Sequence, residues 1–423
     1  MTDIFNIDPS IFAFPVNVLA GLVILFIAWV APLHTMKHSI IATLLLIIAS
    51  IVLGLAPASW HFATSWVFIA VILWFLIVLA SATLKRLSAM RGNFNLSNLT
   101  FILHHAGMWI AVAAGLLGRA DMQEVRLIAE RTDYSNSAIT ASYEASTLPF
   151  SVKLDDFTVE RYPSGEPSLF RACISIDDSF EVTKGTIEVN KPLSYKGYQL
   201  YLSSYDSSGG SDSPYCILQI VRQPWKWILL AGIVMMLFGA VLSFFRSGKW
   251  KISRLVLFIF LTGVAVYAVF IVIGMQLHSK PLAPALQSAW FVPHITMYMF
   301  SYALLGCTFL LAVISIFNRK SDMLSKMDFT ASLGVAFFTI GMLFGAVWAK
   351  QAWGNYWTWD PKETWAAVAW LGFLLYIHLR KCSNIPKKLL ILTVVLSFMA
   401  LQMCWYGVNY LPSAKESVHT YIK

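Results

Sequence analysis

The sequence predicts an α-helical membrane protein that crosses the bilayer about ten times and carries one small β-rich domain outside it. Of its 423 residues, 58% are hydrophobic and only 13% are charged, whereas soluble domains are nearer half apolar and a quarter charged. Apolar runs recur, each long enough to cross about 30 Å of hydrocarbon. A single long polar stretch, about 118–224, separates two groups of these runs.

The order of these runs predicts four parts. N-terminal membrane helices occupy 1–117, and an extracytoplasmic β-rich domain follows over 118–224. A linking membrane helix and a cytoplasmic loop occupy 225–254, and a second membrane domain fills 255–423. The segment 1–10 has no Lys or Arg, so we expect the first apolar run to be retained as a helix and not cleaved as a signal peptide. The expected spans are about 11–32, 39–56, 62–84, 98–117, 225–245, 255–276, 294–317, 329–349, 361–379 and 388–408.

Basic residues set the expected orientation, because Lys and Arg gather in cytoplasmic loops. The other short loops hold only Lys280, Lys350 and Lys362. Both termini, the polar stretch and the loop 350–360 are therefore expected outside a bacterial plasma membrane. The same clustering explains the net charge of +9 and argues against a nucleic-acid partner. The cytoplasmic set is Lys37, Lys85, Arg86, Arg91, Arg246, Lys249, Lys251, Arg254, Arg319, Lys320, Lys326, Arg380, Lys381, Lys387 and Lys388.

The polar stretch is typical of a small antiparallel β-domain. Phe150, Val152 and Leu154 alternate with polar residues, and glycines at intervals supply turns. Its two cysteines, Cys173 and Cys216, would face an oxidising compartment. Spacing alone does not decide whether they form a disulfide, because bonding depends on geometry.

Residues 353–365, WGNYWTWDPKETW, are the most distinctive segment. An aromatic belt at the membrane interface is one interpretation. A belt does not explain this density of rings or the glycine and polar residues between them. A ligand platform does, because a large, flat, apolar ligand gains from stacking and area burial. The platform candidates are Trp353, Tyr356, Trp357, Trp359 and Trp365.

Asp360-Pro361-Lys362-Glu363 also predicts a helix start. Asp is favoured at the N-cap, Pro at the first helical position, and Glu three residues after the cap closes a capping box. Direct contact of Asp360 with a ligand is the alternative role.

Four of the nine histidines lie where a metal could use them. His105 and His378 are predicted inside membrane helices near the cytoplasmic face, while His294 and His419 lie near the outer face. Neutral imidazole is a common iron ligand. The alternative is an ordinary hydrogen-bonded histidine at a helix end. His104 is about 100° round the helix from His105, so both cannot share one ligand face.

These residues resemble the System II cytochrome c synthase family, the Ccs type. The loop 353–365 is similar to its tryptophan-rich WWD motif, and LQSAW at 286–290 followed by His294 is similar to the segment of its first external haem ligand. YIHLR at 376–380 and VHTY at 418–421 resemble its membrane-histidine and second external-ligand segments. HHAGMW at 104–109 and VNKPLSYKGYQLY at 189–201 resemble the partner subunit, CcsB or ResB. The chain thus resembles a fusion of both halves.

The resemblance implies a holocytochrome c synthase (haem lyase) that also transports its substrate. Haem b would be bound by His105 and His378 and then move to the WWD loop, with His294 and His419 as axial ligands. Its vinyl groups would react there with the two thiols of a CxxCH apocytochrome c, kept reduced by a thiol-reducing partner. The residues implied in this attachment step are His294, His419, Trp353, Trp357, Trp359 and Asp360.

Two alternatives remain open from the sequence. A membrane electron-transfer cytochrome would use two bis-histidine haems at two depths. A haem exporter would deliver haem without attaching it.

Overall fold

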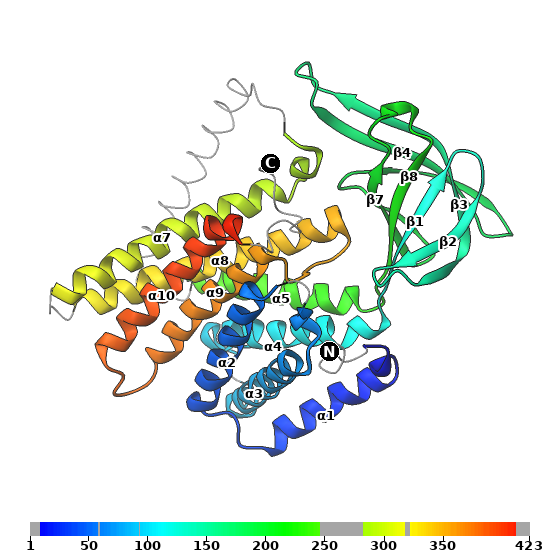
Figure 1. Ribbon diagram of the computed structural model, residues 1–423. Helices are drawn as coiled ribbons and strands as arrows, with labels where there is room; N and C mark the ends of the chain where they lie inside the picture. Colours follow the sequence, from blue (N-terminus) through cyan, green and yellow to red (C-terminus); the bar gives the residue numbers. More distant parts are fainter. Residues whose placement is uncertain (1–8, 58–59, 93, 246–281, 318–321, 412–423) are drawn as a thin grey trace.

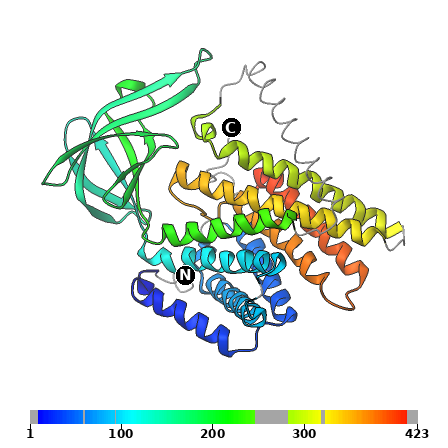
Figure 2. The ribbon, with the colours of Figure 1, turned by 180° about the vertical axis from the view of Figure 1, so that it is seen from behind.

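The computed structural model describes residues 9–57, 60–92, 94–245, 282–317 and 322–411. Its helices pack side by side, and an antiparallel β-domain stands at one end of them (Figure 1). Seen from behind, α4 and α5 run next to each other and both meet the β-domain (Figure 2). The helices are α1 Val16–Val30, α2 Met36–Leu55, α3 Trp66–Met90, α4 Leu96–Leu117, α5 Lys226–Phe245, α7 Phe291–Phe317, α8 Asp322–Trp353, α9 Pro361–Leu379 and α10 Lys387–Trp405.

Nearly every predicted span coincides with one of these helices. The exception is the span predicted over 255–276, which lies outside the described residues. The helix α1 is shorter than predicted, because Pro15 stands at its N-cap and a short 3-10 turn, Pro9–Phe12, precedes it. The helix α8 is longer, with 32 residues. Its polar ends continue the helix beyond the apolar run that hydropathy detects, to a length of about 48 Å.

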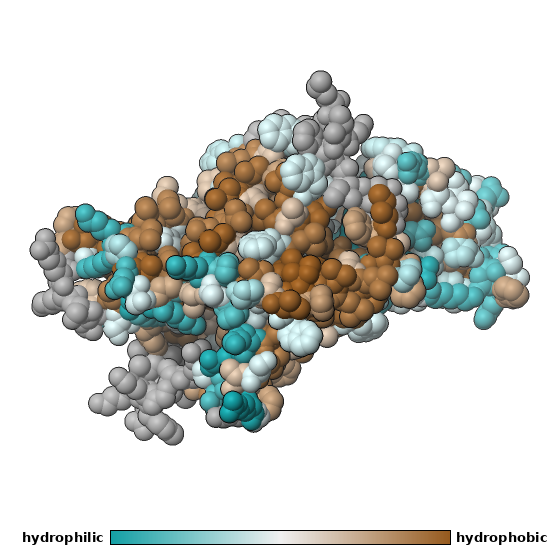
Figure 3. All heavy atoms as spheres, turned by 90° about the horizontal axis from the view of Figure 1, so that it is seen from below, coloured by the Kyte–Doolittle hydropathy of each residue, from teal (hydrophilic) through white to brown (hydrophobic). Residues whose placement is uncertain are grey.

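Hydropathy and burial agree with a membrane location for the helical part. Seven described helices are long and apolar enough to cross a membrane: α2 to α5, α7, α8 and α10. Hydrophobic residues dominate the surface of the helical part, while the surface of the β-domain is mostly hydrophilic (Figure 3). The structure therefore supports a polytopic membrane protein with one polar domain at its end.

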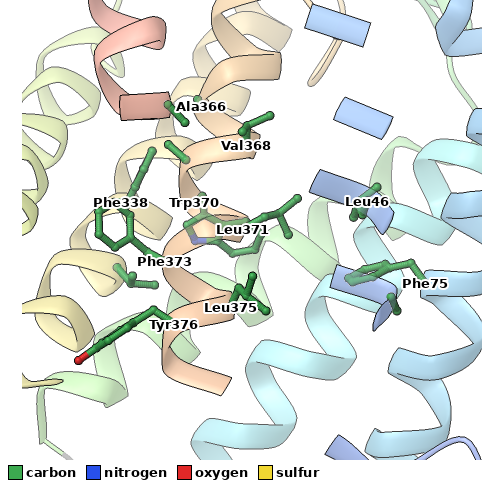
Figure 4. Close-up of a cluster of buried hydrophobic side chains, with 14 of the residues drawn as sticks. Leu46, Phe75, Phe338, Ala366, Val368, Trp370, Leu371, Phe373, Leu375 and Tyr376 are labelled. Atoms are coloured by element: carbon green, nitrogen blue, oxygen red, sulfur yellow. The ribbon is translucent and has the colours of Figure 1, made fainter. Parts of the chain in front are cut away.

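The helix α9 lies at the centre of the second membrane domain. It packs against α2, α8 and α10, and side chains of α9 meet Leu46 of α2, Phe75 of α3 and Phe338 of α8 (Figure 4). Its Trp370 is buried and donates its indole N–H to Thr339 Oγ1 at 2.9 Å. Because α9 is surrounded by protein, it needs less apolar character than a helix that faces lipid.

The predicted β-domain is confirmed as one eight-stranded antiparallel sheet in the order β5-β4-β3-β2-β1-β8-β7-β6. Phe150, Val152 and Leu154 alternate into its core, as the sequence predicts. The sheet curls, so that β5 also contacts β6 and β7. The strands are β1 Gln123–Glu130, β2 Ser135–Thr140, β3 Ala145–Arg161, β4 Pro167–Asp177, β5 Val182–Glu188, β6 Leu193–Tyr195, β7 Tyr198–Tyr205 and β8 Tyr215–Arg222.

The two cysteines of this domain are free thiols. Cys173 lies on β4 and Cys216 on β8, and three strands separate them in the sheet. Burial raises the pKa of the Cys216 thiol to about 12, so it remains protonated. The disulfide that the sequence left open is therefore not formed.

Candidate functional site

The loop between α8 and α9, residues 353–360, is called the tryptophan loop from here on. It begins at the last residue of α8 and ends at the N-cap of α9. The predicted helix start is confirmed: the Asp360 side chain caps the first turn, and Glu363 reaches back to the backbone N–H of Asp360 at 3.2 Å. Glu363 also accepts the backbone N–H of Thr358 at 2.8 Å. The carboxylates thus fix the end of the loop, whatever else Asp360 contacts.

The predicted platform residues do not form one continuous surface. Tyr356 and Trp365 are buried, at 8% and 7% exposure. A Cβ on Gly54 of α2 would lie 2.9 Å from Trp365 Nε1, so this ring packs between helices. Burial also raises the pKa of Tyr356, which keeps the phenol neutral. The rings of Tyr356 and Trp365 are therefore packed inside the protein and are not part of an accessible aromatic surface.

Trp353, Trp357 and Trp359 are half-buried and remain partly accessible. Trp357 and Trp359 meet edge to face with centroids 5.7 Å apart, and Trp359 packs in the same manner on Phe68 of α3 at 5.1 Å. Trp359 has a φ of 60°, which is an unfavourable conformation for a bulky residue. The surrounding packing therefore holds these rings in a set arrangement.

His294 lies in the first turn of α7 and is packed onto α8. Its Nδ1–H donates to the carbonyl oxygen of Gly341 at 2.8 Å, which leaves the ring lone pair on Nε2. Gly345 provides the space for this ring, because a Cβ there would lie 2.6 Å from His294 Cε1. Trp348 stands 5.7 Å from the histidine and 5.0 Å from Trp353, centroid to centroid. An aromatic contact thus links His294 to the tryptophan loop.

His378 is the last but one residue of α9, the helix that begins at the tryptophan loop, so His378 and the loop are at opposite ends of α9. His105 is the tenth of the 22 residues of α4, near the middle of that helix. Each histidine donates Nδ1–H to the carbonyl four residues before it, His105 to Phe101 at 2.9 Å and His378 to Leu374 at 2.7 Å.

The hydrogen bonds from Nδ1 decide which nitrogen of each imidazole can bind a metal. With Nδ1 protonated, a neutral imidazole carries its lone pair on Nε2, the nitrogen that can bind a metal. A hydrogen bond from the other nitrogen is also the usual way to orient a ligand histidine. His104 behaves differently, since its Nε2 is bonded to Ser243 Oγ of α5 at 3.1 Å. The described residues hold no cluster of three metal-binding side chains.

Other side chains around these histidines were not foreseen from the sequence. Arg380 binds Asp328 of α8 through two bonds of 2.7 and 2.6 Å, and Tyr376 donates to the same carboxylate at 2.8 Å. These two residues flank His378 on α9. The signal present in the sequence was Asp328, an acidic residue at the start of an apolar run. The predicted ligand His419 lies outside the described residues.

Comparison with known families identifies both halves of the chain. Residues 73–215 match the ResB-like family, and residues 225–414 match the cytochrome c assembly protein family. The chain therefore combines a ResB-like region and a cytochrome c assembly region, in the order consistent with a fused System II protein. The ResB-like half comes first and the CcsA-like half second.

Curated relatives named CcsA are similar to about a third of this chain. Cytochrome c biogenesis protein CcsA of Chlamydomonas reinhardtii is 38% identical over 156 residues, which are 34% of this chain and 43% of that protein. The protein of the same name from Cuscuta exaltata is 34% identical over 168 residues, 31% of this chain and 54% of the relative. The one from Pelargonium hortorum is 33% identical over 185 residues, 32% and 58% respectively. The chain spans about half the length of the curated relatives it matches.

Proposed function

We propose that this protein moves haem b across the plasma membrane and attaches it covalently to the CxxCH motif of apocytochrome c on the outer side. His105 and His378 would bind the haem near the cytoplasmic face. The tryptophan loop, with His294 and His419 as axial ligands, would hold it during attachment. Haem is here a substrate, passed from one pair of histidines to the other.

The observation that carries this proposal is the separation of two histidine sites by one buried helix. α9 carries Asp360 of the tryptophan loop at one end and His378 at the other. At 1.5 Å per residue these positions are about 27 Å apart, close to the thickness of the hydrocarbon. A protein that only bound haem would need one such site. Two sites at opposite faces suit a substrate that must cross.

The reaction itself needs positioning more than acid–base chemistry. Each cysteine S–H of the apocytochrome adds across one haem vinyl C=C, so that sulfur bonds to the carbon next to the ring and hydrogen to the terminal carbon. Atoms and electrons balance without an oxidant. The reacting thiols belong to the substrate, while His294 fixes the iron and the tryptophan rings fix the plane. Asp360 and Glu363 keep the end of the loop in place.

Coexpression with an apocytochrome c tests the proposal against its alternatives. A synthase gives covalent haem on the CxxCH motif, detected by haem staining after denaturation. A Cys→Ser change in both motif cysteines of the apocytochrome is the control. A haem exporter would release free haem outside and give no covalent product, and a membrane electron-transfer cytochrome would give neither.

The orientation that the proposal needs is open to cysteine labelling. Single cysteines near residues 355 and 415, in a chain without its native cysteines, should react with an impermeant reagent added outside bacterial cells. Single cysteines near 249 and 384 should not react. The reverse pattern would place the tryptophan loop in the cytoplasm and contradict attachment on the outer side.

A further inference from the structure

Two strands of the β-domain, β7 and β8, have a second buried face. Leu200, Leu218 and Ile220 of β7 and β8 point into the domain core. Their neighbours Tyr201 and Val221 must point the other way, because side chains alternate along a strand. The outer face of such a sheet is commonly in water. Yet Tyr201 is only 3% exposed and Val221 only 1%, so something covers this face.

The tryptophan loop is what covers it. A Cβ on Gly354 would lie 3.0 Å from Val221 Cγ2 and 3.1 Å from Tyr201 Cε2. Gly354 also has a φ of 87°, a conformation that side chains disfavour. The loop backbone therefore rests directly on the β-domain at this residue, and glycine is needed there for two separate reasons.

Polar contacts surround this apolar one. Gln219 Nε2 donates to Glu124 Oε1 at 2.8 Å and to the carbonyl oxygen of Trp353 at 3.1 Å. Asn355 Nδ2 donates to the other oxygen of Glu124 at 3.3 Å. Glu124 stands opposite Val221 in the β1–β8 ladder, which puts it diagonal to Gln219 on the same face. Glu124 is thus the acceptor that the loop and the sheet share.

A buried lysine also holds the tryptophan loop through hydrogen bonds. Lys350 near the end of α8 is 6% exposed, and its ammonium donates to the carbonyl oxygen of Gly354 at 2.8 Å and to Gln223 Oε1 at 3.0 Å. Gln223 immediately follows β8. Asn355 is 9% exposed. Donors as buried as these cost free energy when their acceptors are removed.

We infer that the ResB-like β-domain is part of the outer haem site, with Glu124 as the residue that positions the tryptophan loop. The inference rests on the proposed function. Glu124 does not touch the reacting atoms. It holds Asn355 directly and Trp353 through Gln219, at the start of the loop that carries Trp357 and Trp359. The carboxyl end of the loop has its own support in the capping box of α9, so the amino end is the one that the β-domain must fix.

Amide hydrogen exchange of the purified full chain tests the positioning directly. Glu124→Ala should raise exchange in residues 353–359 by roughly tenfold, the effect of losing about one hydrogen bond to a charged group. Glu124→Gln should restore much of the protection, because its amide oxygen can still accept from Asn355. Glu130→Ala, an exposed residue on the same strand, is the matched control and should leave the loop unchanged. Unaltered exchange in Glu124→Ala would overturn the inference.

Attachment kinetics test the functional part. Glu124→Ala and Asn355→Ala should each lower the rate of covalent attachment at saturating apocytochrome by roughly tenfold. The double variant should lose little more than Glu124→Ala, since the contact that Asn355→Ala removes is already absent from that variant. Haem bound by His105 and His378 should stay at the wild-type amount. Losses that add up in the double variant would contradict a positioning role. So would raised amide exchange in the tryptophan loop together with a normal rate of attachment.

The two readouts separate this inference from the proposed function. Wild-type protein that forms no covalent product would contradict the proposed function, and the exchange result would then decide by itself whether Glu124 holds the loop. Should Glu124→Ala not fold, Asn355→Ala breaks the same contact from the loop side and gives the same test.

Discussion

The inner histidine pair and the outer tryptophan loop are held in place by different means. His105 and His378 each bond to a carbonyl of their own helix, four residues earlier. His294 bonds to the backbone of another helix, and Asn355 bonds to a β-strand 231 positions away in the chain. His105 and His378 are thus oriented within their own helices, whereas His294 and the tryptophan loop are held by contacts with other helices and with the β-domain.

The two regions should therefore respond differently to substitutions. A change at the inner site should act through the altered residue alone. The outer site should respond both to changes in its own residues and to changes in the β-domain that supports it.

The largest effect is expected at the proposed outer ligands. His294→Ala or His419→Ala should lower covalent attachment by more than the roughly 10–100-fold that a lost supporting contact costs at a metal site. Added imidazole should partly restore it, because the free molecule can occupy the vacated axial position. His38→Ala, which removes an exposed histidine bonded to Thr35, is the control. Full activity of His419→Ala would mean that the terminal residues are no ligand.

Changes at the inner pair should reduce haem content and not only attachment. His105→Ala and His378→Ala should each lower haem per protein about tenfold or more, while His104→Gln on the neighbouring position should have little effect. His294→Ala should instead retain haem at the inner site. The measurement is haem per protein by pyridine assay, beside covalent product. Inner variants with normal haem but no attachment would contradict transfer from inner to outer site.

A weaker effect is expected at Asp328, which ties α8 to α9 beside His378. Asp328→Asn removes the charge that Arg380 binds through two bonds. Both partners are about one-third exposed, at 35% and 32%, so the loss of stability should be about 1 kcal/mol. Haem content should fall by a smaller factor than in His378→Ala. Asp133→Asn, on an exposed turn of the β-domain, controls for the loss of charge, and an equal effect there would remove any special role of Asp328.

The smallest effect concerns pH and the β-domain. The Lys196 ammonium, with donors from Tyr195, Glu181 and Phe180, holds the pKa of Asp178 well below its ordinary value. A depressed carboxyl pKa adds stability that is complete above the unfolded value of about 3.9 and is lost as pH falls through the folded value. Amide exchange over residues 170–200 should therefore be steady from pH 7 to 5 and rise in acid, once corrected for intrinsic rates. If Asp178→Asn showed the same rise of exchange in acid, protonation of Asp178 could not be its cause.

Much of the fold follows from patterns within short windows of sequence. The capping box at Asp360 and Glu363 was predicted and is confirmed, because it depends on residues three apart. The alternation at Phe150, Val152 and Leu154 placed one strand and its buried face correctly. The extra length of α8 was missed, because its polar ends carry no hydropathy signal. The ligand role of His419 stays a prediction.

The platform of aromatic rings shows the limit of such patterns. The sequence groups Tyr356 and Trp365 with the other rings of the segment, yet both are buried against neighbouring elements. Which ring faces outward depends on Gly54, Phe68 and the β-domain, none of which is near the loop in the chain. Spacing within thirteen residues cannot contain that information.

By itself the sequence determined which segments are apolar enough to cross a membrane and where the basic residues lie, and it predicted which side chains could bind iron, since apolar length, charge and side-chain chemistry are local properties. Only the tertiary structure decided that His104 bonds to Ser243 of α5, whereas its neighbour His105 bonds within its own helix. It also decided that the β-domain rests on Gly354 through Tyr201 and Val221. Such contacts join residues tens to hundreds of positions apart. Their geometry arises from the packing of whole helices and strands, which no short window of sequence specifies.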